Sequence, residues 1–166
     1  MSDQDNGLPA YLKVKGPTMK SFYDAALAAN KDEDVIKRVT SKTVVEGRSG
    51  IRRITIRNHQ IIADSPPAWC GYDLGASAPE ILLGALTACI SHMYLVVGGI
   101  QNVKFLSLEV EASGSLDLRR GSEGHEDKIP GIQNIAYTVF ISSDETKQTL
   151  EELHALVEKI CPLYVC

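Results

Sequence analysis

Apolar and polar residues alternate along the chain between residues 36 and 63. Two polar stretches, residues 46–50 and 57–60, interrupt this alternation. A period of two is typical of β-strands, and stretches rich in glycine, asparagine and charged residues are typical of turns. The pattern therefore predicts strands joined by turns, followed by a proline- and glycine-containing loop over residues 64–75.

The next segment is strongly apolar, because residues 81–100 contain no charged side chain. Just before it, Ser77 and Glu80 have the spacing of a capping box, in which both side chains bond to backbone N–H groups at a helix start. We therefore expect a long helix from about Ala78 to about residues 98–99. Such a helix is apolar on all sides, so protein must cover it.

This apolar segment is also about long enough to span a bilayer. Glycine, threonine, serine and histidine interrupt it, however, and no basic residues flank it, so we expect no membrane association. A chain this short does not easily cover such a helix alone. We therefore expect an intertwined homodimer.

Alternation returns after the long helix, in residues 103–118 and 132–141, and predicts two more extended segments with a polar loop between them. Residues 142–145 (Ser-Ser-Asp-Glu) have the form of a second capping box. They predict a helix whose apolar stripe ends at Cys161, where the following proline stops it. At the amino terminus, we expect a loosely held lead and then a short helix from Pro17, ended by the charged residues that follow it.

Composition narrows the class of protein. The chain has 166 residues, 44% of them hydrophobic and 23% charged, as expected for one globular domain. Its net charge of -4 provides no basic surface for nucleic acid. The polar, acidic amino terminus does not resemble a secretory signal, so we expect a cytoplasmic protein with reduced thiols.

Cys89 and Cys161 are the candidate reactive groups. Cys89 lies in the uncharged segment, and a thiol in such a low-dielectric environment needs a nearby cation to become a reactive thiolate. Arg48, which follows a glycine in a predicted turn, is the candidate cation, with Arg53 as the alternative. On the residues alone, each of the two thiols could instead be a small buried side chain.

The remaining cysteines and histidines suggest less. His92, three residues from Cys89, could carry a proton, although a single histidine there is more often a hydrogen-bonded core residue. We expect Cys70 to be incidental, and we expect no constellation around His59, His125 and His154. The cysteines lack Cys-x-x-Cys spacing, so the sequence predicts no metal site.

Three motifs together resemble the OsmC/Ohr family of hydroperoxide-resistance proteins. They are Gly-Ala-Ser-Ala-Pro-Glu-Ile-Leu-Leu-Gly-Ala-Leu-Thr-Ala-Cys (75–89), Ile-Cys-Pro (160–162) and Glu-Gly-Arg-Ser-Gly (46–50). The resemblance spans residues 36–166, which leaves residues 1–35 as an N-terminal extension with a short helix. It implies an α+β fold in which antiparallel sheets wrap around long central helices in an intertwined homodimer.

The resemblance also implies thiol-dependent reduction of organic hydroperoxides, without a metal or organic cofactor and with electrons from external dithiols such as lipoyl groups. Cys89 matches the peroxidatic cysteine, Cys161 the resolving cysteine, and Arg48 the arginine that activates the thiolate. Glu80 is placed with the catalytic residues as a partner of Arg48, although it lies one position from the family's glutamate and its capping role also explains it. Cys89 would become a sulfenic acid, and Cys161 would convert it to a disulfide. Cys166 is the alternative resolving thiol.

Leu82, Leu86 and Met93 would form an apolar wall that favours a hydrocarbon-bearing peroxide. Two other functions stay open at this point. The chain could be a noncatalytic protein that binds a small hydrophobic molecule or senses redox state through its thiols. It could also be a thioester hydrolase with Cys89 as nucleophile.

Overall fold

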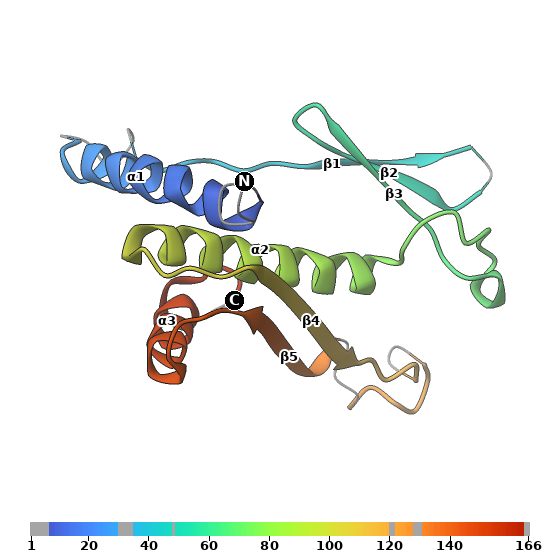
Figure 1. The fold of residues 1–166 in the computed structure, drawn as a ribbon. Coiled ribbons are helices and arrows are strands. Elements are labelled where there is room, and N and C mark those ends of the chain that lie inside the picture. The colour runs from blue at the N-terminus through green and yellow to red at the C-terminus, as the bar shows by residue number, and fades with distance from the viewer. Residues whose placement is uncertain (1–6, 30–34, 48, 120–121, 128–130, 165–166) are drawn as a thin grey trace. The chain divides into compact units, whose positions relative to one another are not determined.

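The computed structural model describes residues 7–29, 35–47, 49–119, 122–127 and 131–164 (Figure 1). In chain order the elements are α1 (Leu8–Leu27), β1 (Lys42–Glu46), β2 (Ile51–Ile56), β3 (His59–Ala63), the 3₁₀ turn η3 (Pro67–Trp69), α2 (Ala78–Gln101), β4 (Ser107–Ser115), β5 (Gln133–Ser142) and α3 (Lys147–Ile160). The α+β prediction with antiparallel sheets is confirmed. The chain divides into two compact units, one formed by Lys31–Gly84 and the other by Met1–Asn30 with Ala85–Cys166.

The first unit is built on a three-stranded antiparallel sheet in the order β1-β2-β3. Its strands follow the alternating segments predicted from the sequence. Glu46 pairs with Ile51, and Ile56 pairs with His59, so both polar interruptions are turns between neighbouring strands. The strands and turns are confirmed, except that residues 36–41 precede β1 and that His59 and Gln60, which were predicted to be in a turn, belong to β3.

Asp64 organises the loop between β3 and α2. Its side chain is only 1% exposed and accepts hydrogen bonds from the backbone N–H groups of Tyr72 (3.0 Å) and Leu74 (3.2 Å). Burial would raise the pKa of Asp64, but these N–H groups, that of Ser65 and the positive charge of Arg52 lower it. A buried carboxylate therefore holds this loop, whose large apolar side chains Trp69, Tyr72 and Leu74 are exposed.

The second unit contains the main hydrophobic core. The β4–β5 pair forms an antiparallel hairpin in which Ser107 pairs with Ser142 and Val110 with Val139. The buried apolar side chains come from α1, α2, the connection to β4, α3 and the residue that ends α3. They are Leu12, Ile90, Met93, Tyr94, Val96, Val97, Val103, Phe105, Leu153, Val157 and Cys161.

Helix α1 is longer than the sequence predicted. It begins at Leu8, so the expectation of a loose lead up to residue 16 is wrong for the residues described from Gly7 onward. Pro9 occupies the first turn, where a proline is tolerated, and Pro17, the predicted start, lies inside the helix. The helix ends at Leu27, before the charged residues 31–34 that were predicted to end it and that lie outside the described residues.

Close packing against α2 explains why α1 extends through this region (Figure 1). A Cβ atom built on Gly16 would lie 2.0 Å from the carbonyl oxygen of Gly99, which shows that the two backbones nearly touch. Glycine permits this approach because it has no side chain. The apolar side of α1 also contributes Leu12 to the core.

The start of α3 also differs from the prediction. The helix begins at Lys147, and its cap is Thr146, whose side chain accepts a hydrogen bond from the Thr149 N–H at 3.2 Å. Ser142 ends β5 instead of capping a helix. The Glu145 carboxylate accepts a hydrogen bond from the Lys104 N–H (3.2 Å). Tertiary contact therefore uses a residue that the local pattern assigned to a cap.

Helix α2 starts at Ala78 as predicted and ends at Gln101, slightly beyond the expected glycine pair. By length and composition it could cross a membrane, and 33% of its most apolar 18-residue stretch is buried. One such helix is weak evidence for a membrane span, because the core helices of soluble proteins have the same length and composition.

Candidate functional site

The structure brings Cys89 and Cys161 together. Cys89 lies within α2 and is partly buried, whereas Cys161 directly follows α3 and is only 1% exposed. Their Sγ atoms are 3.5 Å apart. Both residues belong to the second unit, so this contact lies within one compact body.

Local sequence explains the position of Cys161. Leu153, Val157 and Cys161 are spaced four residues apart and therefore lie on the same side of α3, facing the core. The backbone N–H of Cys161 still bonds to the Val157 carbonyl at 2.9 Å, but its φ and ψ of −70° and 117° are extended. Pro162 cannot continue the helix. The thiol thus comes from the last core-facing position of α3.

The distance between the two sulfur atoms suits disulfide chemistry. An S–S bond is about 2.05 Å long, so the two thiols would need to approach by roughly 1.5 Å to form one. Core side chains surround the pair: Ile90 follows Cys89 and is 1% exposed, and Val157 is also 1% exposed. A small local movement is therefore enough for the two thiols to be oxidised together.

The predicted cationic residues have different outcomes. Arg48 lies outside the described residues. The alternative, Arg53, forms an ion pair with Glu46 and donates a hydrogen bond to the Gln60 side chain (2.9 Å). The hydrogen bond and charge of Glu46 raise the pKa of Arg53, and the bond from Arg53 lowers the pKa of Glu46. Arg53 is thus held within its own sheet.

Glu80 forms the predicted cap, with one difference. Its carboxylate accepts hydrogen bonds from both the backbone N–H (2.7 Å) and the hydroxyl (2.6 Å) of Ser77, and these bonds lower its pKa. The Ser77 hydroxyl was expected to accept from the backbone, but it donates to Glu80 instead. A role of Glu80 as a partner of Arg48 stays a prediction.

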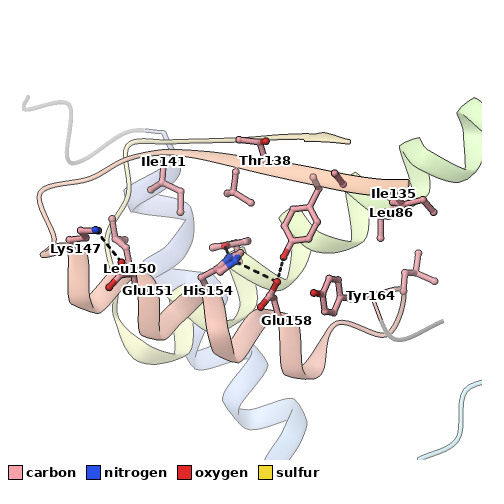
Figure 2. A pocket seen from close by; sticks show the side chains of 15 residues that line it. Leu86, Ile135, Thr138, Ile141, Lys147, Leu150, Glu151, His154, Glu158 and Tyr164 are labelled. Atoms are coloured by element: carbon pink, nitrogen blue, oxygen red, sulfur yellow. Dashed lines mark hydrogen bonds and ion pairs between the residues drawn. The ribbon is translucent and has the colours of Figure 1, made fainter. Parts of the chain in front are cut away.

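A cluster of polar side chains around Glu158 was missed from the sequence. The Tyr137 hydroxyl donates to the Glu158 carboxylate (2.7 Å), and His154 Nε2 lies 3.6 Å from the same carboxylate (Figure 2). Tyr164 also interacts electrostatically with Glu158, and the Tyr94 hydroxyl hydrogen-bonds to His154 Nδ1. We call these five residues the Glu158 cluster.

The expectation that His154 belongs to no constellation is therefore wrong. The signal in the sequence was the spacing of His154 and Glu158, which are four residues apart on one helix face. The tyrosines come from α2, β5 and the segment after α3, and only folding brings them there. Burial and the Glu158 charge raise the pKa of Tyr94 to about 12.

Beside this cluster lies an open cavity of about 820 Å³ between β5 and α3 (Figure 2). Its walls are apolar at Ile135, Ile141 and Leu150, and the Glu158 cluster lines part of it. Of the predicted apolar wall, Leu86 lines this cavity. Met93 is instead a core residue, and Leu82 is 57% exposed.

Two other residues considered from the sequence, His92 and Cys70, are not part of the Cys89–Cys161 contact or of the Glu158 cluster. His92 is exposed, and desolvation together with the positive charge of Lys15 lowers its pKa. Cys70 is exposed, and Cys166 lies outside the described residues. Among the described residues, no group of three or more histidine, cysteine, aspartate or glutamate side chains could hold a metal ion.

Solved structures show the same fold. An OsmC-like protein from Mycoplasma pneumoniae matches with a TM-score of 0.67 and 19% identity, covering 78% of this chain and 86% of that one. The organic hydroperoxide resistance protein OsmC from Legionella pneumophila matches with a TM-score of 0.58 and 16% identity, covering 78% and 88%. The organic hydroperoxide resistance protein OhrB of Bacillus subtilis matches with a TM-score of 0.52 and 19% identity, covering 78% and 89%.

A search of curated protein sequences found no match to the chain. These three structural matches are below 25% identity, so they establish the fold alone. The family assignment comes from a sequence model, described as OsmC-like protein, that matches residues 71–166 and thus includes both Cys89 and Cys161. Since this match covers more than half of the 166 residues, the chain belongs to the OsmC-like protein family.

Proposed function

We propose that the protein is a cysteine-based peroxidase that reduces organic hydroperoxides and takes its electrons from an external dithiol. The observation that carries the proposal is the 3.5 Å contact between the Sγ atoms of Cys89 and Cys161. The two cysteines are 72 residues apart in the chain, and filling space in the core does not require their sulfur atoms to be in contact. The names of the Legionella and Bacillus proteins of similar fold support the same class of reaction.

In the first step, the Cys89 thiolate attacks one peroxide oxygen. The O–O bond breaks, the alkoxide leaves and takes up a proton as an alcohol, and Cys89 becomes a sulfenic acid. Arg48 is proposed to stabilise the thiolate and to donate to the peroxide oxygens, since a guanidinium favours the charged form of a nearby acid. Cys89 suits this role better than Cys161, because Cys161 is almost completely buried.

In the second step, the Cys161 thiolate attacks the sulfenic sulfur of Cys89. An S–S bond forms, and the hydroxyl group leaves with a proton as water. An external dithiol, such as a lipoyl group, then reduces the disulfide by thiol–disulfide exchange and is itself oxidised to a disulfide. The cycle needs neither a metal nor an organic cofactor.

Glu80 is proposed to orient Arg48 in addition to capping α2. Both described hydrogen bonds of Glu80 use the same carboxylate oxygen, Oε2.

We also propose that the protein works in the cytoplasm as a homodimer and binds neither nucleic acid nor membrane. The N-terminal segment, residues 1–35, is proposed to be an extension of an OsmC-like domain formed by residues 36–166.

The test measures consumption of cumene hydroperoxide and hydrogen peroxide by the reduced protein with dihydrolipoamide as electron donor. We expect faster turnover with the organic peroxide. Cys89→Ser should abolish it, Cys161→Ser should allow oxidation without turnover, and Arg48→Ala should slow oxidation of Cys89. Cys70→Ser is the matched control, because it removes an exposed thiol and should leave the rate unchanged.

No peroxide consumption by the wild-type protein would overturn the proposal. Binding of a hydrophobic molecule without turnover would then favour the noncatalytic alternative, for which the open cavity between β5 and α3 offers a place. Release of free thiol from acyl thioesters would favour a hydrolase. Turnover that survives Cys89→Ser would assign the chemistry to another group.

A further inference from the structure

The chain just after Cys161 contacts α3 and β5 through Tyr164. The backbone N–H of Tyr164 donates to the Cys161 carbonyl at 3.2 Å. The Tyr164 hydroxyl interacts electrostatically with Glu158, and the Tyr164 ring meets that of Tyr137 edge to face, with ring centres 5.8 Å apart. Cys161 therefore lies between the end of α3 and a turn that the Glu158 cluster holds in place.

Glu158 joins three parts of the chain. It lies on α3 one turn before Cys161, accepts a hydrogen bond from Tyr137 on β5 (2.7 Å) and interacts with Tyr164 beyond the helix end. The Tyr137 hydrogen bond is the largest influence on its pKa, and Tyr164 and the charge of His154 lower the pKa further, while desolvation raises it. The carboxylate is therefore ionised at neutral pH and is a strong hydrogen-bond acceptor.

We propose that Glu158 is a positioning residue, which directs the Cys161 thiol toward Cys89 by holding the end of α3 and the Tyr164 turn against β5. The proposal rests on the proposed function, in which these two thiols form a disulfide. Cys161 has left the helical conformation, so its direction depends on contacts on both sides of it. On one side its N–H bonds to Val157, and on the other its carbonyl accepts from Tyr164.

Holding two reacting groups in contact raises their effective concentration. When the Cys161 thiolate attacks the Cys89 sulfenic sulfur, the S–S bond forms and water leaves, and Glu158 takes no part in the bond changes. Losing Glu158 should therefore slow disulfide formation without slowing the preceding attack on the peroxide. A residue that merely supported the fold would change both steps or neither.

The first measurement is independent of peroxide. The effective concentration of Cys161 for Cys89 is obtained by equilibrating the protein with reduced and oxidised glutathione, in a background with Cys70→Ser and Cys166→Ser. A hydrogen bond to a charged group contributes enough free energy to change an equilibrium about tenfold. We therefore expect Glu158→Ala to lower the effective concentration of Cys161 roughly tenfold. We expect a smaller decrease for Tyr164→Phe, which removes one hydroxyl contact and serves as the test if Glu158→Ala does not fold.

The matched control is Glu151→Gln. Glu151 lies on the same helix and lines the same cavity, but it forms an ion pair with Lys147 at 3.4 Å, and it lies seven residues before Glu158. We expect the control to keep the effective concentration of the wild-type protein. Rescue is expected from Glu158→Gln, which keeps the shape and one acceptor oxygen and should lie between wild type and Glu158→Ala.

The second measurement follows the sulfenic acid after one equivalent of cumene hydroperoxide. In Glu158→Ala, Cys89 should be oxidised at the wild-type rate, and the sulfenic acid should persist roughly tenfold longer before dimedone traps it. Unchanged effective concentrations in both Glu158→Ala and Tyr164→Phe would overturn the positioning role even if the protein reduces peroxides. A lowered concentration in a protein that consumes no peroxide would support positioning and refute only the peroxidase.

Discussion

At the scale of single residues, burial distinguishes the two thiols. Cys161 is 1% exposed and belongs to the core, whereas Cys89 is only partly buried on α2. Any reagent from solution would therefore reach Cys89 first. The sequence identified both residues as candidates, but it could not order them by accessibility without the family resemblance, because both lie in apolar surroundings.

The Glu158 cluster leads to a prediction about stability and pH. The hydrogen bond from Tyr137, the interaction with Tyr164 and the charge of His154 hold the pKa of Glu158 below its ordinary value of 4.5. A carboxylate with a lowered folded-state pKa contributes stability above its unfolded pKa and loses it as the pH falls through the folded pKa. Glu158→Gln should therefore be less stable than wild type at neutral pH, and the difference should disappear in acid.

Urea unfolding followed by circular dichroism over a series of pH values measures this difference. Glu151→Gln removes the same charge from the same helix but not the tyrosine contacts, so it separates the effect of the cluster from that of net charge. A gap between wild type and Glu158→Gln that stays constant down to the acid limit would contradict the prediction.

At the scale of elements, helix α1 shows how tertiary contact corrects a local pattern. Pro9 and Pro17 both have the character of a helix start, and only the packing against α2 shows that the first one is used. Likewise, the two serine-led boxes look alike in sequence, yet Ser77 precedes a helix and Ser142 ends a strand. Local signals predicted both of these helices and misplaced the starts of α1 and α3.

The contact between α1 and α2 can be tested with one methyl group. In Gly16→Ala the new Cβ would meet the backbone of Gly99 at 2.0 Å, and backbone atoms cannot turn away as a flexible side chain can. We expect a loss of about 1 to 3 kcal/mol in the free energy of unfolding, as for other overpacked sites. Ser21→Ala changes an exposed position of the same helix and should be nearly neutral. Equal urea midpoints for Gly16→Ala and wild type would refute this packing.

At the scale of the whole molecule, α2 remains incompletely covered within one chain. It is 24 residues long, and 33% of its most apolar 18-residue stretch is buried. Burying exposed apolar side chains away from water is favourable, and the predicted homodimer would bury those of α2. Light scattering should therefore give about twice the chain mass of 18.1 kDa.

A charge placed on α2 tests the same expectation. Leu82→Glu puts a carboxylate at a position that is 57% exposed in one chain and should lower the measured mass to that of one chain. Ser122→Glu adds the same charge to an exposed position outside α2 and should leave the mass unchanged. A wild-type mass equal to one chain would refute the homodimer.

The sequence by itself determined the strands and turns of residues 36–63, the apolar central helix with its Ser77–Glu80 cap and the two candidate cysteines, while its family resemblance implied the α+β class. The strands and the capped helix follow from periodicity and capping, which are properties of neighbouring residues. The tertiary structure alone decided that the Cys89 and Cys161 sulfur atoms lie 3.5 Å apart and that Tyr94, Tyr137 and Tyr164 gather around His154 and Glu158. Such contacts join residues far apart in the chain, so they depend on how whole elements pack and not on any local pattern.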